Sequence, residues 1–135
     1  MIDLDRARNV LRDHHNGILA TLKRDGRPQL SNVLYLLDDD GRIKVSVTQT
    51  RAKTHNLRRD QRVTLHVQGR NWYEFVVVDG AADFVEGPGV AEALRGHFRK
   101  LRGEHPNWSE FDAAMVKDQR LLLSIEISYA YGVLP

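Results

Sequence analysis

Short stretches of alternating apolar and polar residues recur along this chain, and they predict an antiparallel β-sheet. Turn residues separate the stretches. Among them, Asp25-Gly26 strongly favours a tight hairpin because this pair tolerates a positive φ angle. The expected strands are 17–24, 27–37, 42–48, 62–68, 72–79, 81–86 and 120–131. Their close, regular spacing is typical of a small β-barrel.

Other segments switch to the 3.6-residue period of an amphipathic helix. Residues 2–15 and 88–102 each place apolar side chains on one helical face. A shorter helix is expected to begin at Ser109, where Asp112 completes an imperfect capping box. Because a late helical excursion interrupts a run of strands, the pattern predicts an α+β protein built on a barrel of six or seven strands. Such a barrel is filled by its own side chains, so we expect ligands to bind in an external groove.

The composition narrows the class of protein. A length of 135 residues with 41% hydrophobic content predicts one domain, residues 1–135, with a substantial core. The chain contains no Cys, which excludes disulfides, thiol nucleophiles and thiolate metal sites. Its first residues are charged rather than apolar, and no apolar run is long enough to span a membrane. We therefore expect a cytoplasmic protein that does not act at a membrane.

Positive charge is concentrated in one part of the chain. Residues 51–70 contain six cationic side chains and one anionic side chain, whereas the whole chain has 20 Lys and Arg against 18 Asp and Glu. Arg51 and Lys53 follow the strand 42–48 directly and precede a helical turn that contains Ala52 and Leu57. Free backbone N–H groups at such a strand-to-helix junction add to the side-chain charge, and proteins commonly hold phosphate in this way. A solvated cationic surface is the alternative interpretation.

Residues for catalysis by the protein alone are not evident. The six His residues lack metal-ligand spacing, so we expect no metal site. Neither a nucleophile turn nor the phosphate loop of nucleotide hydrolases is present. These absences fit a protein in which a bound cofactor carries the reaction. Trp72 and Tyr73 are candidates for stacking on a planar ring, or they are ordinary core aromatics.

Four stretches of the chain resemble a known family. Residues 20–33, 45–60, 103–108 and 127–132 are similar to the split β-barrel proteins of the pyridoxamine-phosphate-oxidase-like superfamily. Within it they look most like the actinobacterial flavin/deazaflavin oxidoreductases that use coenzyme F420. The resemblance implies an FMN-binding type of split barrel with flanking helices. It also implies a homodimer with cofactor sites at the interface between the subunits.

The resemblance assigns roles to particular residues. It implies that Arg51 and Lys53 bind the cofactor phosphate and that Asn56 supports the strand-to-helix junction. Trp72 is expected to close the site from the partner subunit. The residues expected along the ring and the ribityl chain are Ser46, Thr48 and Gln49. Arg58 and Arg59 are further cations beyond the phosphate, and we expect them to contact the acidic tail that F420 has and FMN lacks.

These features favour one function and leave alternatives open. The leading hypothesis is transfer of a hydride from reduced F420 to a quinone, an enone or a tetrapyrrole. An FMN-dependent reductase or oxidase is the alternative enzyme. Pyridoxamine phosphate oxidation is less favoured because the chain ends in Tyr131-Gly-Val-Leu-Pro135 and lacks a terminal segment with Arg and His. Nucleic-acid binding is disfavoured because the cations cluster within twenty residues instead of following an exposed face.

Overall fold

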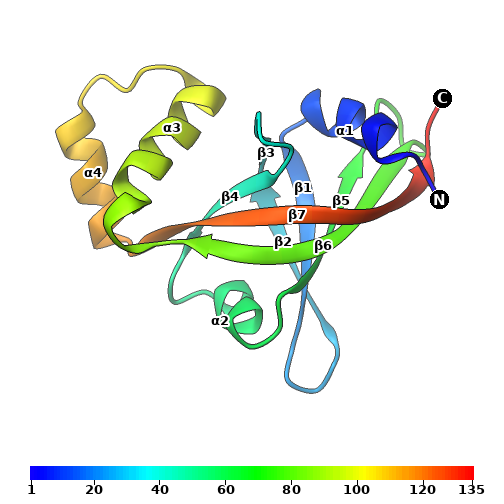
Figure 1. The fold of residues 1–135 in the computed structure, drawn as a ribbon, viewed down its shortest axis with the longest axis horizontal. Helices are drawn as coiled ribbons and strands as arrows, with labels where there is room; N and C mark the ends of the chain where they lie inside the picture. The colour runs from blue at the N-terminus through cyan, green and yellow to red at the C-terminus, as the bar shows by residue number, and fades with distance from the viewer.

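The computed structural model describes residues 1–135, and its strands form one strongly curled antiparallel sheet flanked by helices (Figure 1). The strand order is β2-β1-β5-β6-β7-β4-β3. The elements are α1 (Leu4–Arg12), β1 (Asn16–Leu22), β2 (Pro28–Leu34), β3 (Leu36–Leu37), β4 (Ile43–Thr48), α2 (Ala52–Arg59), β5 (Arg62–Gln68), β6 (Phe75–Val85), the 3₁₀ turn η1 (Gly87–Gly89), α3 (Val90–Arg102), α4 (Trp108–Lys117) and β7 (Arg120–Val133). The expected α+β split barrel is confirmed.

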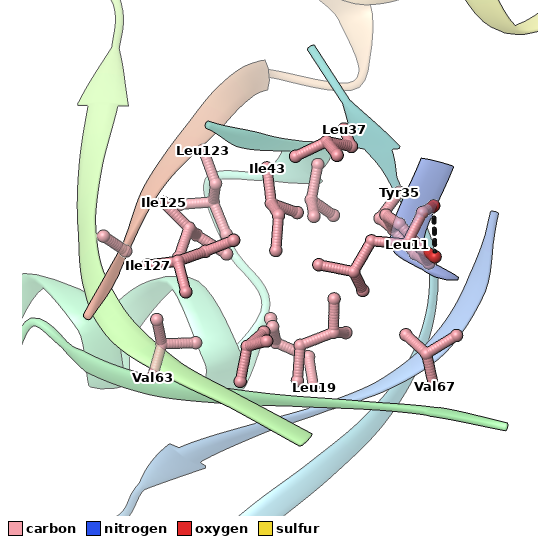
Figure 2. Packing of buried hydrophobic residues seen from close by; sticks show 14 of the residues in the cluster. Leu11, Leu19, Tyr35, Leu37, Ile43, Val63, Val67, Leu123, Ile125 and Ile127 are labelled. Carbon is pink, nitrogen blue, oxygen red and sulfur yellow. Dashed lines mark hydrogen bonds between the residues drawn. The ribbon is translucent and has the colours of Figure 1, made fainter. Parts of the chain in front are cut away.

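The barrel interior is closed by packed side chains. The inward-facing residues of β1, β4, β5, β6 and β7 join Leu11 of α1 in one cluster of 21 buried residues (Figure 2). The Tyr35 hydroxyl donates a hydrogen bond of 2.8 Å to the carbonyl oxygen of Leu11, which holds α1 across one end of the barrel. A ligand must therefore bind outside this core, as the strand count predicts.

The sheet does not close on itself. Strand β2 pairs only with β1, whereas β4 pairs with β7 and β3, so no ladder joins β2 to β4. Strand β2 begins at Pro28, a residue that fits an edge strand because it lacks an N–H donor. The gap between these two strands is the split of the barrel, and it leaves room for a groove.

Two strand predictions are wrong in their bounds. The expected strand 27–37 is interrupted at Tyr35, whose side chain turns into the core. The expected turn at Asp79-Gly80 is a register shift inside the continuous strand β6. A Cβ atom at Gly80 would overlap the carbonyl oxygen of Glu126, so this position requires glycine for close approach to β7.

Helices α3 and α4 form a hairpin between β6 and β7. Leu94 of α3 and Phe111 of α4 pack against Leu122 of β7. Helix α4 begins at Trp108, because the Asn107 side chain accepts a hydrogen bond of 3.1 Å from the N–H of Glu110. The predicted cap at Ser109 is therefore wrong. No helix of the protein is both long and apolar enough to cross a membrane.

Ion pairs fasten α3 to the turn between β3 and β4. Lys44 Nζ lies 2.9 Å from Asp38 Oδ2 and 2.9 Å from Asp40 Oδ2, and Lys100 of α3 bonds the other oxygen of Asp38. Burial of Asp38 opposes its ionisation, but the hydrogen bonds from Lys100 and Lys44 outweigh this effect and hold the pKa of Asp38 well below its ordinary value. The C-terminal half of α3 is thereby tied beside the start of β4.

Candidate functional site

The split of the barrel contains a groove of about 600 Å³. Strands β2 and β4 form its floor, and the hairpin of α3 and α4 forms its wall. The lining residues are Ser31, Asn32, Val33, Leu34, Val45, Ser46, Val47, Thr48, Arg51, Lys53, Leu94, His97, Phe98, Leu101, Arg102, Phe111, Met115 and Arg120. None of them is an acid, so the groove favours an anionic ligand.

Three cations gather where β4 ends. Arg51 immediately precedes α2, Lys53 lies in its first turn, and Arg120 starts β7 directly opposite Thr48 in the β4–β7 ladder. One Arg120 guanidinium nitrogen lies 3.3 Å from the carbonyl oxygen of Ser46. None of the three cations forms an ion pair, whereas nine other Arg and Lys residues have a carboxylate partner. We call Arg51, Lys53 and Arg120 the cationic clamp.

The electrostatics of Lys53 reflect this crowding. Burial lowers the pKa of Lys53, and the charges of Arg51 and Arg120 lower it further. No anion of the protein offsets these effects, so repulsion among the three cations lowers the stability of the folded chain. An anion bound among the three side chains would relieve that repulsion.

The backbone at the clamp also has unused hydrogen-bonding capacity. No side chain caps the first turn of α2, and the N–H groups of Ala52 and Lys53 are free to meet a ligand. The Thr48 hydroxyl oxygen is buried from water and has no hydrogen-bond partner. The carbonyl oxygen of Thr48 accepts a hydrogen bond of 2.7 Å from the Thr54 hydroxyl, which fixes the bend between β4 and α2. Cations, free N–H groups and an unpaired hydroxyl together fit a phosphate group.

The wall formed by α3 and α4 is apolar. Phe98 packs edge-on against Phe111 with ring centroids 5.1 Å apart, and Leu94, Leu101 and Met115 complete the surface that faces the groove. Such a wall suits a flat aromatic group. The groove thus combines an anion-binding end with an apolar side.

His97 is the one imidazole in this wall. It is buried, and its Nδ1 atom has no hydrogen-bond partner. Burial lowers the pKa of His97 to about 4, with the charge of Lys44 also lowering it and that of Asp38 opposing the shift. His97 is consequently neutral near pH 7.

The structure brings together part of the predicted set. Ser46, Thr48, Arg51 and Lys53 all line the groove, whereas Gln49 is exposed and lies outside it. Asn56 is buried outside the groove. Its amide nitrogen lies 3.1 Å from the hydroxyl oxygen of Thr21, so the side chain joins α2 to β1 at the expected junction.

Arg58 and Arg59 lie on the other side of α2, in a separate shallow hollow that they share with Arg24. Arg58 forms a bidentate ion pair with Glu86, and its guanidinium lies 3.9 Å from the centre of the Phe84 ring. Arg59 donates to the carbonyl oxygen of Leu22. These two cations therefore already have partners within the chain.

Trp72 lies in the turn before β6, with 77% of its surface exposed. The expected strand from residue 72 is wrong, because the Asn71 side chain accepts hydrogen bonds from the N–H groups of Tyr73 and Glu74 and holds a turn there. Tyr73 is also exposed, so the interpretation of the pair as core aromatics is wrong. Within a single chain, Trp72 does not line the groove.

Several groove residues were not among the sequence predictions. The polar ones are Ser31, Asn32, His97, Arg102 and Arg120. Only Arg120 offered a local signal, because it is a cation at the first position of the expected strand 120–131. Ser31 and Asn32 reach the groove from the edge strand β2, and His97 and Arg102 reach it from the α3–α4 hairpin.

Comparison with known proteins supports this architecture. A family model described as pyridoxamine 5'-phosphate oxidase matches residues 4–134. A conserved hypothetical protein from Mycobacterium tuberculosis has a TM-score of 0.75 at 24% identity, with 96% of this chain and 83% of that chain covered. An F420 reductase has a TM-score of 0.71 at 22% identity, with 92% and 94% covered. A heme-binding protein from Mycobacterium smegmatis has a TM-score of 0.70 at 20% identity, with 98% and 55% covered. At these identities the solved structures show a shared fold.

Proposed function

Since the chain belongs to the pyridoxamine 5'-phosphate oxidase family, we propose that it is an oxidoreductase that holds coenzyme F420 in the groove. In this proposal a hydride passes from the reduced cofactor to a conjugated acceptor such as a quinone, an enone or a tetrapyrrole. The observation that carries the proposal is the cationic clamp, which places three unpaired cations beside the uncapped end of α2.

The residues present fit the phosphate of such a cofactor. Arg51, Lys53 and Arg120 supply charge, and the Thr48 hydroxyl supplies a hydrogen-bonding group that has no partner within the chain. Charge-assisted hydrogen bonds of this kind are among the strongest that a protein makes to a ligand. The clamp would fix the phosphate end, so that the rest of the molecule lies along the groove.

The remaining lining would orient the ring and limit access of water. Ser46 and Thr48 lie on one face of β4, so Ser46 would contact the ring and Thr48 the chain next to the phosphate, while Phe98 and Leu101 would cover the opposite side. The cofactor supplies the hydride chemistry when it is bound. The protein contributes binding, orientation and an apolar wall that limits access of water. We assign no proton donor among its side chains.

The choice between F420 and FMN depends on cations beyond the clamp. Both cofactors carry a phosphate, but F420 continues into a tail with several carboxylates, and Arg58 and Arg59, on the far side of α2, are the cations that we propose to meet it. FMN is the second candidate. The ion pair between Arg58 and Glu86 favours it, because Arg58 must leave Glu86 before it can bind the tail of F420. Each such exposed contact contributes less than about 1 kcal/mol and weakens with salt.

Fluorescence titration of the apoprotein with F420 and with FMN, at low and at high salt, tests this proposal. We expect F420 to bind more tightly at low salt, and we expect the double variant Arg58→Ala/Arg59→Ala to reduce that preference while sparing FMN. Equal or tighter FMN binding by the wild-type protein would transfer the assignment to an FMN-dependent reductase. Failure of both cofactors to bind would refute the cofactor site itself.

We also propose that two copies of the chain pair through the outer face of the sheet. The register of β1, β2, β5, β6 and β7 places a set of exposed apolar side chains on this face. They are Ile18, Leu30, Leu34, Tyr129, Tyr131 and Val133. Asn32 and Val33 line both the groove and a hollow on this face, so a second copy would sit directly beside the groove. In that arrangement Trp72 has a partner subunit to contact.

Light scattering in solution tests the dimer. We expect the wild-type mass to be that of two chains and Tyr131→Lys to yield monomers, whereas the control Val116→Lys, at an exposed apolar position on α4, should remain dimeric. Trp72→Ala should weaken cofactor binding and spare the binding of inorganic phosphate. A wild-type monomer that still binds cofactor would contradict this part of the proposal.

A further inference from the structure

The last turn of α3 contains three cations, and two of them have partners. Arg99 lies 2.9 Å from Glu104 Oε1 and stacks over the Trp108 ring, while Lys100 bonds Asp38. Cations are favoured near a helix C-terminus by the helix dipole alone, so their presence there does not imply a ligand. The third cation, Arg102, has neither an ion pair nor a hydrogen bond. It lines the groove.

The acid nearest to Arg102 in the chain is not free to pair with it. One carboxylate oxygen of Glu104 accepts from Arg99, and the other accepts a hydrogen bond of 3.1 Å from Trp108 Nε1. No acid lines the groove itself. The guanidinium of Arg102 is therefore an unmatched charge at the rim.

Arg102 and the cationic clamp lie at different ends of the groove. Lys100 binds the turn that precedes β4, whereas the clamp follows Thr48 at the end of β4. At about 3.3 Å per residue, this strand separates its two ends by roughly 16 Å. Figure 1 shows the same arrangement, with α3 ending beside β3 while β4 runs away toward α2.

The surface between the two ends carries no charge. Leu94, Phe98 and Leu101 are apolar, and the buried imidazole of His97 is neutral near pH 7. The groove thus presents a cation cluster, an uncharged middle and a second cation. A molecule or stacked pair of molecules that matches it has an anionic group at each end and a flat apolar part between.

We propose that Arg102 is a specificity-determining residue that binds a carboxylate on the hydride acceptor, so that acidic planar acceptors are preferred over neutral ones. This inference rests on the proposed function, because it assigns the clamp to the cofactor and the opposite end to the acceptor. Arg102 is exposed, so its contribution is that of a surface charge pair, and we expect a three- to five-fold preference.

The test compares anthraquinone-2-carboxylate with the neutral anthraquinone-2-carboxamide. Their dissociation constants are measured by equilibrium dialysis against the wild-type protein with and without bound F420, and KM is measured with reduced F420. We expect the wild-type protein to bind the carboxylate about three- to five-fold more tightly at low salt. Arg102→Gln should remove the preference and Arg102→Lys should keep part of it. Lys117→Gln, which removes an exposed cation outside the groove, should leave it unchanged.

The possible results separate this inference from the proposed function. If F420 binds normally but the wild-type protein shows no preference, or Arg102→Gln retains it, the role of Arg102 is wrong and the proposed function stands. If F420 does not bind the wild-type protein, the proposed function is wrong, and so is the inference that depends on it. F420 affinity should be the same in Arg102→Gln as in the wild-type protein, because the clamp is intact.

Discussion

Replacement of Lys53 by Met should change stability and ligand binding in opposite directions. The substitution keeps a long, flexible apolar side chain at a half-buried position and removes only the charge. Because burial and the neighbouring Arg51 and Arg120 lower the pKa of Lys53, the ammonium group is unfavourable in the folded protein without ligand. We therefore expect the free energy of unfolding of the apoprotein to stay equal or rise.

Binding should weaken at the same time. Loss of one charge-assisted hydrogen bond to phosphate removes about 1.5–3 kcal/mol, which corresponds to roughly 10- to 150-fold in affinity. With ligand at a hundred times the wild-type dissociation constant, the wild-type protein gains about 2.7 kcal/mol of stability. If affinity falls about 30-fold, the variant gains only about 0.9 kcal/mol at the same ligand concentration.

Urea unfolding with and without FMN measures both quantities in one experiment. FMN serves as the phosphate-bearing probe whichever cofactor is native. Lys117→Met is the matched control, since Lys117 is an exposed cation without a partner. A variant that is clearly less stable than the wild-type apoprotein, or that gains as much stability from FMN, would refute the interpretation of the clamp.

Further predictions concern the scaffold. Because the pKa of Asp38 is lowered, its ion pairs contribute stability that is fully present above about pH 4 and is lost as pH falls further. Lys44→Met should therefore destabilise the protein at pH 7 but much less at pH 3, and an equal loss in urea unfolding at both values would contradict this. Gly80→Ala should cost about 1–3 kcal/mol through overpacking against β7, whereas a melting temperature like that of the wild type would show that β6 adapts. Asn56→Ala should cost about 1–3 kcal/mol because the Thr21 hydroxyl loses its partner, and calorimetry would detect the loss.

The sequence was sufficient to predict the barrel because strand alternation and turn residues are local features of the chain. Alternation places β5 at residues 62–68, with the bounds that the structure has, and β7 differs only in extending to Val133. Asp25-Gly26 forms the predicted turn, with Gly26 at a φ of 85°. The alternation of apolar and polar residues and the residue types of a turn each span only a few positions, so both can be recognised in a single sequence.

The errors arise where distant parts of the chain decide the local conformation. Asp79-Gly80 has the composition of a turn, but the close approach of β7 is what requires its glycine. Tyr35 interrupts a strand because its hydroxyl binds Leu11 of α1. Each contact joins segments separated along the chain, and alternation within a short window does not report it.

The same distinction applies to the site. Arg51 and Lys53 were predictable because the strand-to-helix junction that presents them is a local feature. Arg120 joins them only because β7 pairs with β4, and His97 and Arg102 arrive with a hairpin inserted after β6. A cation run in the sequence also suggested that Arg58 and Arg59 extend the clamp, but α2 directs them to its opposite side.

The α3–α4 hairpin is inserted into the sheet at one place, between β6 and β7. Val85 and Leu122 are paired neighbours on adjacent strands, so the chain leaves the sheet and returns to it at almost the same place. The segment 87–118, which contains η1, α3 and α4, takes part in no strand pairing, so it can be lengthened, shortened or replaced without changing the sheet. The clamp belongs to the barrel and its α2 junction, whereas the apolar wall and Arg102 belong to the insert. Under the proposed function, exchange of this one segment would change which acceptors are used while the residues proposed to anchor the cofactor stay in place.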